Sequence, residues 1–151
     1  MIVKQILDRR ARDVVTVGLK TPITDAARVM TENEIGALVI KDMDGAVAGI
    51  LSERDILAAV GDVEMELDGV TADALMTRKV VTCGPEDSII QIILKFDALG
   101  IRHLVVMDDG KLVGMVSIRD VMEAFSRMIL EKKVFGQEQF ATEFAAALAA
   151  A

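Results

Sequence analysis

The chain contains one nine-residue pattern twice, and this repeat constrains the fold more than any other feature of the sequence. GILSERDIL occupies residues 49–57, and GMVSIRDVM occupies residues 114–122. Both copies read glycine, two apolar residues, serine, a variable residue, arginine, aspartate and two apolar residues. Their glycines, Gly49 and Gly114, lie 65 positions apart. Because the flanking segments match in the same order, the sequence predicts two copies of one structural unit.

Each copy predicts the same order of elements. A β-rich run is followed by a helical segment with apolar residues at i, i+3, i+4 and i+7. Two further β-runs flank the turn segments DMDG and DDG, which favour hairpins. A second helical segment begins at the repeated serine, so each copy reads β-α-β-β-α. The predicted runs are 14–17, 23–30, 37–42, 47–51 and 52–60 in the first copy and 80–83, 89–96, 103–108, 112–116 and 117–125 in the second.

The predicted fold class is α+β, with two β-α-β-β-α repeats packed sheet to sheet about a pseudo-twofold axis. Such packing would leave paired clefts at the junction of the two halves. Short lead-in helices are expected at 3–7 and 71–76, and the acidic segment 61–69 is expected to be a linker. The predicted boundaries place the first repeat with its lead-in helix at 1–62, the linker and second repeat at 63–130, and a helical tail at 131–151.

The predicted tail carries Phe140, Phe144 and Leu148 at four-residue intervals in an Ala-rich segment. This apolar stripe has no obvious partner within the repeats. Two interpretations stay open: the tail packs on a second copy and strengthens a homodimer, or it folds back on its own subunit.

Composition excludes several classes of function. A net charge of −7 is opposite to the basic surface of a nucleic-acid-binding protein. One His and one Cys exclude a His/Cys zinc cluster as the main theme. No apolar run approaches the roughly 20 residues of a membrane span, and the first residues lack the shape of a signal peptide. A cytoplasmic protein without a membrane span is expected.

The repeated segment has two compatible interpretations. Serine followed three residues later by aspartate is a helix-capping box, formed by Ser52 with Asp55 and by Ser117 with Asp120. The same residues suit a nucleotide, because a helix start and a hydroxyl favour phosphate and a carboxylate accepts hydrogen bonds from ribose hydroxyls. The arginine that precedes each aspartate adds a planar cation that matches phosphate oxygens.

Taken together, these motifs resemble a tandem pair of CBS domains, named after cystathionine β-synthase. The resemblance covers roughly residues 10–130 and rests on the VxT of the first strand, the IGALVI and IRHLVV strands and the repeated segment. It implies a module that binds adenosine-containing ligands, senses energy or metabolite state and commonly dimerises. In layout the chain is similar to small stand-alone bacterial CBS-pair proteins.

The resemblance also implies ligand contacts at twelve positions. They are the ribose-binding Asp55 and Asp120, the phosphate-contacting Ser52 and Ser117, the first-strand Thr16 and Thr82 near base or sugar, Val17 and Cys83 beside the adenine, Arg54 and Arg119 next to the phosphate, and Arg102 and His103 toward a phosphate tail.

The two halves differ at one of these places. The first copy has Gly36 and Ala37 where the second has Arg102 and His103, so unequal affinities are expected. The family's usual prolines are replaced by Val39, Val105 and Leu19, which are not among the implied ligand contacts.

Simpler roles remain open for four features. A lone His103 is typical of a packed or interface residue, and Arg54 can pair with Glu53 or another surface acid. The run at residues 9–12 is typical of a solvated face, and Cys83 is typical of a core residue.

The leading hypothesis is a non-catalytic regulatory module that binds AMP, ATP or NAD in the clefts between the repeats. The expected partners are an adenosine nucleotide, a second copy of the chain and an unknown effector protein. No catalytic cofactor or metal is expected. The alternative is a structural homodimerisation module with vestigial or empty clefts. An enzyme ranks third, because the sequence offers no nucleophile with a base, no P-loop and no metal-ligand cluster.

Overall fold

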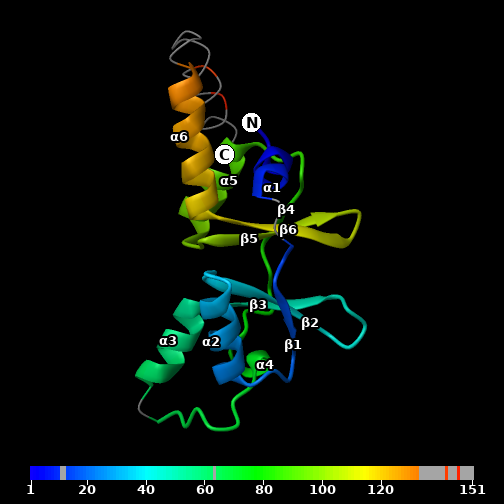
Figure 1. Cartoon of the computed structure of the whole chain (residues 1–151), viewed down its shortest axis with the longest axis vertical. Coiled ribbons are helices and arrows are strands. Elements are labelled where there is room, and N and C mark those ends of the chain that lie inside the picture. Colours follow the sequence, from blue (N-terminus) through cyan, green and yellow to red (C-terminus); the bar gives the residue numbers. More distant parts are fainter. Residues whose placement is uncertain (11–12, 63, 133–141, 143–145, 147–151) are drawn as a thin grey trace. The chain divides into compact units, whose positions relative to one another are not determined.

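The computed structural model describes residues 1–10, 13–62, 64–132, 142 and 146, and it divides into two compact units (Figure 1). One unit is Asp13–Val81. The other joins residues 1–10 to the described residues from 82 onward. Of the predicted tail, residues 133–141, 143–145 and 147–151 lie outside the described part of the chain, so its helical packing stays a prediction.

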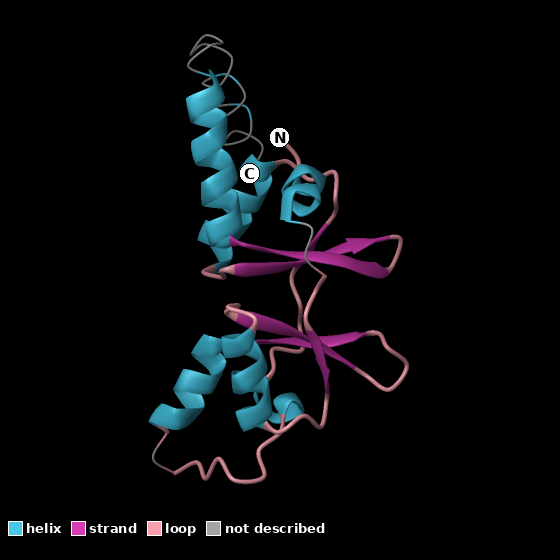
Figure 2. Cartoon of the chain, in the orientation of Figure 1, coloured by secondary structure: helices cyan, strands magenta, loops and turns pink. Residues whose placement is uncertain are grey.

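The unit Asp13–Val81 holds one three-stranded sheet in the order β1-β2-β3. The outer strand β1 runs parallel to β2, and β2 forms an antiparallel hairpin with β3. Helices lie on one face of this sheet (Figure 2). The elements are β1 (Thr16–Gly18), α2 (Ile23–Glu32), β2 (Ala37–Lys41), β3 (Val47–Ser52), α3 (Glu53–Gly61) and α4 (Ala72–Leu75).

The second unit repeats this topology, with a sheet in the order β4-β5-β6. Its hairpin carries a register shift between Val106 and Met107, at the place where the first hairpin shifts between Ile40 and Lys41. The predicted α+β class and the two β-α-β-β-α repeats are confirmed. The elements are α1 (Val3–Arg10), β4 (Thr82–Cys83), α5 (Ile89–Leu99), β5 (His103–Asp108), β6 (Lys111–Ser117) and α6 (Ile118–Lys132).

Each sheet buries a mainly aliphatic core against its helices, and Phe96 of the second unit is a buried aromatic residue. In the first unit one apolar side of α2 packs against alternate residues of the strands. This hydrophobic cluster contains Ile23, Ala26, Met30, Leu38, Ile40, Leu51, Ala72 and Met76. Among the fully buried residues of the second unit are Leu104, Val105, Val106, Val116 and Val121.

Helix α5 shows how local sequence sets an element's ends. Ser88 is its N-cap and forms a capping box with Gln91, in which each side chain accepts a hydrogen bond from the other residue's backbone N–H. Gly100 ends the helix in the left-handed conformation, with φ of 61°, which glycine adopts without a Cβ clash.

Helix α1 precedes the first repeat in the sequence but packs on the second, and α4 precedes the second repeat but packs on the first. α1 contacts β6 and α6, and the Val3 N–H donates to the Asp87 carbonyl at 3.0 Å. α4 contacts β3 and α3, and the Ala72 N–H donates to the Thr21 carbonyl at 2.8 Å. The predicted boundaries follow the sequence and placed 1–62 together, whereas in space residues 1–10 belong to the unit of the second repeat. Periodicity locates an amphipathic helix but does not say which sheet buries its apolar side.

The repeated glycines permit this packing. A Cβ on Gly114 of β6 would lie 2.6 Å from Leu7 Cδ1 in α1. A Cβ on Gly49 of β3 would lie 2.5 Å from Met76 Sδ and 3.0 Å from the Thr77 carbonyl oxygen. Real Cβ atoms do not approach other atoms closer than 3.0 Å. The glycine that opens each repeated segment therefore gives the lead-in segment room against the strand, a role not predicted from the sequence.

Substitution at this contact tests where α1 packs. Gly114→Ala is expected to lower the free energy of unfolding by about 1–2 kcal/mol, because the new methyl overlaps Leu7. Leu7→Ala in the same chain opens space for that methyl, so the double variant is expected to lose less than the sum of the two single losses. Urea denaturation of all four proteins measures the coupling. Losses that add to within about 0.5 kcal/mol would contradict the packing of α1 on β6.

Candidate functional site

The candidate site is the strand-to-helix junction that occurs once in each unit. At the junction of β3 and α3, Asp55 Oδ2 accepts hydrogen bonds from the Ser52 N–H at 2.7 Å and from the Ser52 hydroxyl at 2.6 Å. The Asp55 N–H donates to Ser52 Oγ at 3.4 Å, which completes a capping box. The capping interpretation of this segment is confirmed.

The junction of β6 and α6 has the same hydrogen bonds. Asp120 Oδ2 accepts from the Ser117 N–H at 2.8 Å and from the Ser117 hydroxyl at 2.7 Å. The Asp120 N–H donates to Ser117 Oγ at 3.3 Å. In both units one carboxylate oxygen is thus occupied within the box, and Oδ1 is the oxygen left for any further contact.

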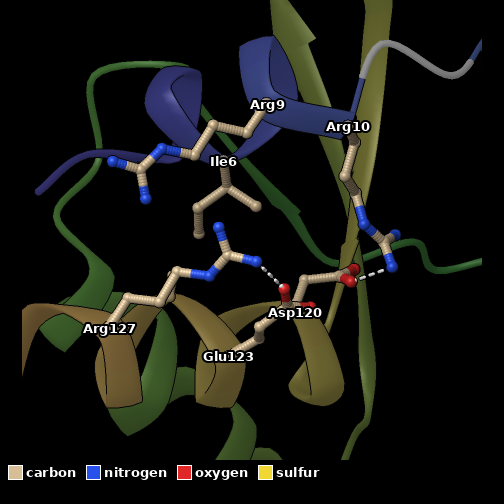
Figure 3. A pocket seen from close by; sticks show the side chains of 7 residues that line it. Ile6, Arg9, Arg10, Asp120, Glu123 and Arg127 are labelled. Atoms are coloured by element: carbon tan, nitrogen blue, oxygen red, sulfur yellow. Dashed lines mark hydrogen bonds and ion pairs between the residues drawn. The ribbon is translucent and has the colours of Figure 1, made fainter. Parts of the chain in front are cut away.

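The two Oδ1 atoms have different surroundings. Asp55 is half-buried, and none of the ion pairs among the described residues involves it. The Asp120 side chain is only 1% exposed, and its Oδ1 forms an ion pair with the guanidinium of Arg10, at the end of α1 (Figure 3). No hydrogen bond accompanies that ion pair, so Asp120 Oδ1 is a buried oxygen without a hydrogen-bond donor among the described residues.

A small open pocket of about 90 Å³ lies between α1 and α6 beside Asp120. In Figure 3, Arg9 and Arg10 reach it from α1, and Arg127 reaches it from α6, where it pairs with Glu123. The pocket residues are Ile6, Arg9, Arg10, Asp120, Glu123, Ala124 and Arg127. The sequence patterns did not single out Glu123 or Arg127 and marked Arg9 and Arg10 only as part of a charged run, because the packing of α1 on α6 is not encoded in either helix alone.

The sheet registers place several predicted residues near these junctions. His103 pairs with Ser117 across β5 and β6, and the Ile118 N–H donates to the Arg102 carbonyl at 2.9 Å. Arg102 and His103 therefore lie beside the Ser117–Asp120 box. Gly36 and Ala37 hold the equivalent positions in the first unit, where Ala37 pairs with Ser52 and the Glu53 N–H donates to the Gly36 carbonyl at 3.0 Å.

The remaining predicted residues lie further from the boxes or face solvent. Thr16 pairs with Val39 of β2, which lies two residues beyond Ala37, the partner of Ser52. Thr82 pairs with Val105 of β5, which lies two residues beyond His103, the partner of Ser117. Val17 is half-buried, whereas Arg54 and Arg119 are exposed in the first turns of α3 and α6. Their ligand contacts stay predictions.

Cys83 behaves as a core residue. Its residue surface is 4% exposed. Loss of hydration on burial, with the nearby Asp87 carboxylate as a second cause, raises the pKa of the Cys83 thiol to about 11. A thiol held protonated in this way is a poor nucleophile.

The raised pKa predicts slow alkylation of the folded protein. At about pH 8, iodoacetamide is expected to modify Cys83 at least about a hundredfold more slowly in native protein than in guanidinium chloride, given two pH units of pKa difference. The folded pKa lies above the ordinary 9.0, so stability from the protonated thiol is complete below pH 9 and is lost as the pH rises toward about 11. Mass spectrometry follows the reaction. Equal native and denatured rates would contradict the burial.

Two features are absent from the part of the chain that the structure describes. No group of three or more His, Cys, Asp or Glu side chains within it is placed to hold a metal ion. No helix within it is long and apolar enough to cross a membrane.

Comparison with known proteins gives consistent matches. The family model of the CBS domain matches the chain twice, over residues 3–62 and 72–127. The crystal structure of a CBS-domain containing protein from Agrobacterium tumefaciens is 38% identical, with a TM-score of 0.78 over 82% of this chain and 92% of that chain. A CBS domain protein from Pyrobaculum aerophilum, solved in complex with AMP, is 27% identical, with a TM-score of 0.74 over 97% of this chain and 99% of that chain.

A third similar structure is a CBS domain pair in complex with 5′-methylthioadenosine and S-adenosyl-L-methionine. It is 26% identical, with a TM-score of 0.75 over 85% of this chain and 98% of that chain. The chain spans 35%, 67% and 61% of the length of the first curated relatives that it matches. Some other relatives carry enzyme names, but the chain covers only 24% of their length.

Proposed function

We propose, from the premise that this chain belongs to the CBS-domain family as a tandem pair, that it is a non-catalytic regulatory module that binds an adenosine-containing ligand. The observation that carries this proposal is the pair of Ser–Asp junctions, one in each repeat, each leaving Oδ1 beyond its capping box. Two similar structures support an adenosine-type ligand, since one was solved with AMP and the other with 5′-methylthioadenosine and S-adenosyl-L-methionine.

The proposed chemistry at the first repeat follows from the capping box. Asp55 Oδ2 is held by two donors from Ser52, which orients the carboxylate and leaves Oδ1 to accept from the ribose hydroxyls. The start of α3 presents backbone N–H groups that favour a phosphate. Arg54 is exposed in the same turn and would add a cation to that phosphate.

The remaining contacts that the resemblance implies are part of this proposal. They are Thr16, Val17, Arg54, Thr82, Cys83, Arg102, His103 and Arg119. AMP, ATP and NAD share the adenosine that the aspartates would recognise, so the proposal commits to the adenosine part of the ligand. A cytoplasmic setting and an effector protein that responds to the bound state complete it.

A thermal-shift panel with AMP, ADP, ATP, NAD, S-adenosylmethionine and GTP tests this function. A ligand at about a hundred times its dissociation constant adds roughly 2.7 kcal/mol of stability. For a chain of this size the midpoint is expected to rise by roughly 5–10 °C. A rise with an adenosine compound and none with GTP would support the proposal. No rise, together with no nucleotide in the supernatant of denatured protein by mass spectrometry, would contradict it.

A homodimer is the second part of the proposal, and exposed apolar side chains on α3 and α6 support it. Leu57 is 71% exposed, and Met122, its equivalent in the repeated segment, is 52% exposed. Val60 and Ile118 on the same helices are 58% and 43% exposed. Exposed apolar residues on a helix are typical of an interaction surface, and each unit carries such residues on the equivalent helix.

Introducing charge on both helices tests the homodimer. Leu57→Asp with Met122→Asp is expected to convert a dimer to a monomer, because two buried carboxylates would face an apolar partner surface. Light scattering after gel filtration measures the mass. Met43→Asp is the matched control, since Met43 is 96% exposed and lies in the turn between β2 and β3. A dimer that survives the double substitution would show that neither helix forms the interface.

A structural module without ligand remains the competing function, and one observation favours it. Both oxygens of Asp120 already contact protein groups, Ser117 and Arg10, so capping and pairing account for this residue without a ligand. Substitution of Asp55, whose Oδ1 has no ion-pair partner among the described residues, separates the two functions.

A further inference from the structure

We infer that Arg10 competes with the ligand for the carboxylate of Asp120, so that the second repeat binds only when Arg10 is displaced and the two repeats bind with unequal affinity. The inference rests on the proposed function and names a regulation of that same site. It makes the C-terminal end of α1 a built-in competitor that acts on one repeat.

The burial of Asp120 carries the first step. Its side chain is 1% exposed, and its Oδ2 already accepts two hydrogen bonds from Ser117. A buried carboxylate without a compensating charge or hydrogen bonds is strongly unfavourable. The Arg10 guanidinium supplies the charge at Oδ1 but not a hydrogen bond. A ligand hydroxyl would need that same Oδ1, because it is the only oxygen of this carboxylate that lacks a hydrogen-bond donor among the described residues.

Arg10 can leave this position without unfolding α1. It is the last residue of the helix, and its side chain is 43% exposed, so a displaced guanidinium regains water readily. The helix itself is held by other residues, since Val3 and Ile6 are buried. Displacement therefore requires a rotamer change at one helix end, which exchanges an ion pair for hydrogen bonds from the ligand.

The first repeat has no equivalent competitor among the described residues. Leu7 lies over Gly114 in the same way as Met76 lies over Gly49, so Leu7 and Met76 are equivalent. Arg10 follows Leu7 by three residues and Lys79 follows Met76 by three, so Arg10 corresponds to Lys79. Helix α4 already ends at Leu75, and Lys79 is exposed.

Without a helix reaching that far, no cation from the lead-in segment pairs with Asp55 in the described part of the chain. The inequality between the repeats thus follows from the greater length of α1.

Adenosine binding to single-repeat variants tests the inference. Asp55→Ala removes the first repeat's carboxylate, and Arg10→Ala is then added to this background. Adenosine is the probe because it has both ribose hydroxyls and no phosphate, so loss of the Arg10 charge does not remove a phosphate contact. Isothermal calorimetry is expected to show that Asp55→Ala with Arg10→Ala binds adenosine about tenfold more tightly than Asp55→Ala alone. The gain arises because binding no longer has to break one charge-assisted interaction.

Matched controls isolate the competition. Arg9→Ala removes the same charge from the same pocket but leaves the pair with Asp120, so its affinity is expected to match the background within about twofold. Arg10→Gln keeps the aliphatic stem and is expected to show the same gain if Arg10→Ala folds poorly by circular dichroism. With 2′-deoxyadenosine the gain is expected to be smaller, because one of the competing hydroxyls is missing.

The outcomes separate the inference from the proposed function. Adenosine binding by Asp55→Ala that is unchanged or weakened by both Arg10 variants would overturn the competition and leave the proposed function standing. An equal gain in affinity with Arg9→Ala would have the same meaning. The same holds if the unsubstituted chain binds adenosine and no variant that carries Asp55→Ala does. If neither the unsubstituted chain nor any variant binds adenosine, AMP or S-adenosylmethionine, the proposed function and the inference both fail.

Discussion

Asp55→Ala is expected to weaken AMP binding by about a hundredfold while the protein stays folded. The substitution removes the half-buried carboxylate whose Oδ1 is proposed to accept from both ribose hydroxyls. Two hydrogen bonds to a charged group at about 1.5 kcal/mol each correspond to roughly this loss. Asp120→Ala is expected to have a smaller effect on the measured affinity, because Arg10 already restricts that carboxylate. Isothermal calorimetry with AMP measures both.

The control for this prediction separates capping from ligand binding. Asp55→Ala also removes one half of a capping box, at a cost of about 1 kcal/mol. Gln91→Ala removes the same half of the capping box at Ser88, in a helix that carries none of the proposed contacts. It is expected to lower stability by a similar amount and leave AMP binding unchanged. If Asp55→Ala binds AMP as the unsubstituted chain does, the structural dimerisation module becomes the better description.

Gly49→Val is expected to destabilise the first unit by about 3 kcal/mol, the largest loss of stability predicted here for a single substitution. Its Cβ would overlap the Met76 side chain and touch the Thr77 carbonyl oxygen, which belongs to the backbone. That backbone is itself paired with β3, since Thr77 and Ile50 exchange hydrogen bonds at 2.8 and 3.1 Å. Side-chain rotation alone therefore cannot relieve the overlap. Urea denaturation measures the loss.

The same substitution at Gly18 is the matched control. Gly18 ends β1 and is exposed, and apart from its chain neighbours no described residue has an atom within 4 Å of a Cβ added to it. Gly18→Val is therefore expected to change stability by less than about 0.5 kcal/mol. Equal stability of the two variants would show that the segment after α4 does not press on β3. A loss confined to Gly49→Val would confirm that the repeated glycine is required by packing.

The inequality of the two repeats bears on how such a module responds to ligand. Their capping boxes agree to within 0.1 Å in each hydrogen bond, as the paired distances of 2.7 and 2.8, 2.6 and 2.7, and 3.4 and 3.3 Å show. Two of the differences between the junctions are the pairing of Arg10 with Asp120 and the presence of Arg102–His103 in place of Gly36–Ala37. Under the competition inferred above, a first ligand is expected to occupy the first repeat and a second to bind at higher concentration by displacing Arg10.

Local patterns in the sequence sufficed for the elements and for the capping boxes. The predicted helix at 23–30 is observed as Ile23–Glu32, and the predicted strand at 103–108 is observed as His103–Asp108. Helical spacing, strand alternation and a serine three residues before an aspartate all act between residues a few positions apart, so a short window contains the whole signal. The twofold repeat then predicted the α+β class, because each unit builds the same sheet.

Only the tertiary structure decided which helix covers which sheet, and with it the state of Asp120. The contact of Leu7 with Gly114 and the pair of Arg10 with Asp120 join residues more than a hundred positions apart. No periodicity spans that separation, and the apolar pattern of α1 or α4 does not identify the sheet that the helix contacts. The sheet that each helix covers depends on which glycine leaves room for which side chain. That depends on close packing within each folded unit, which the sequence pattern does not contain.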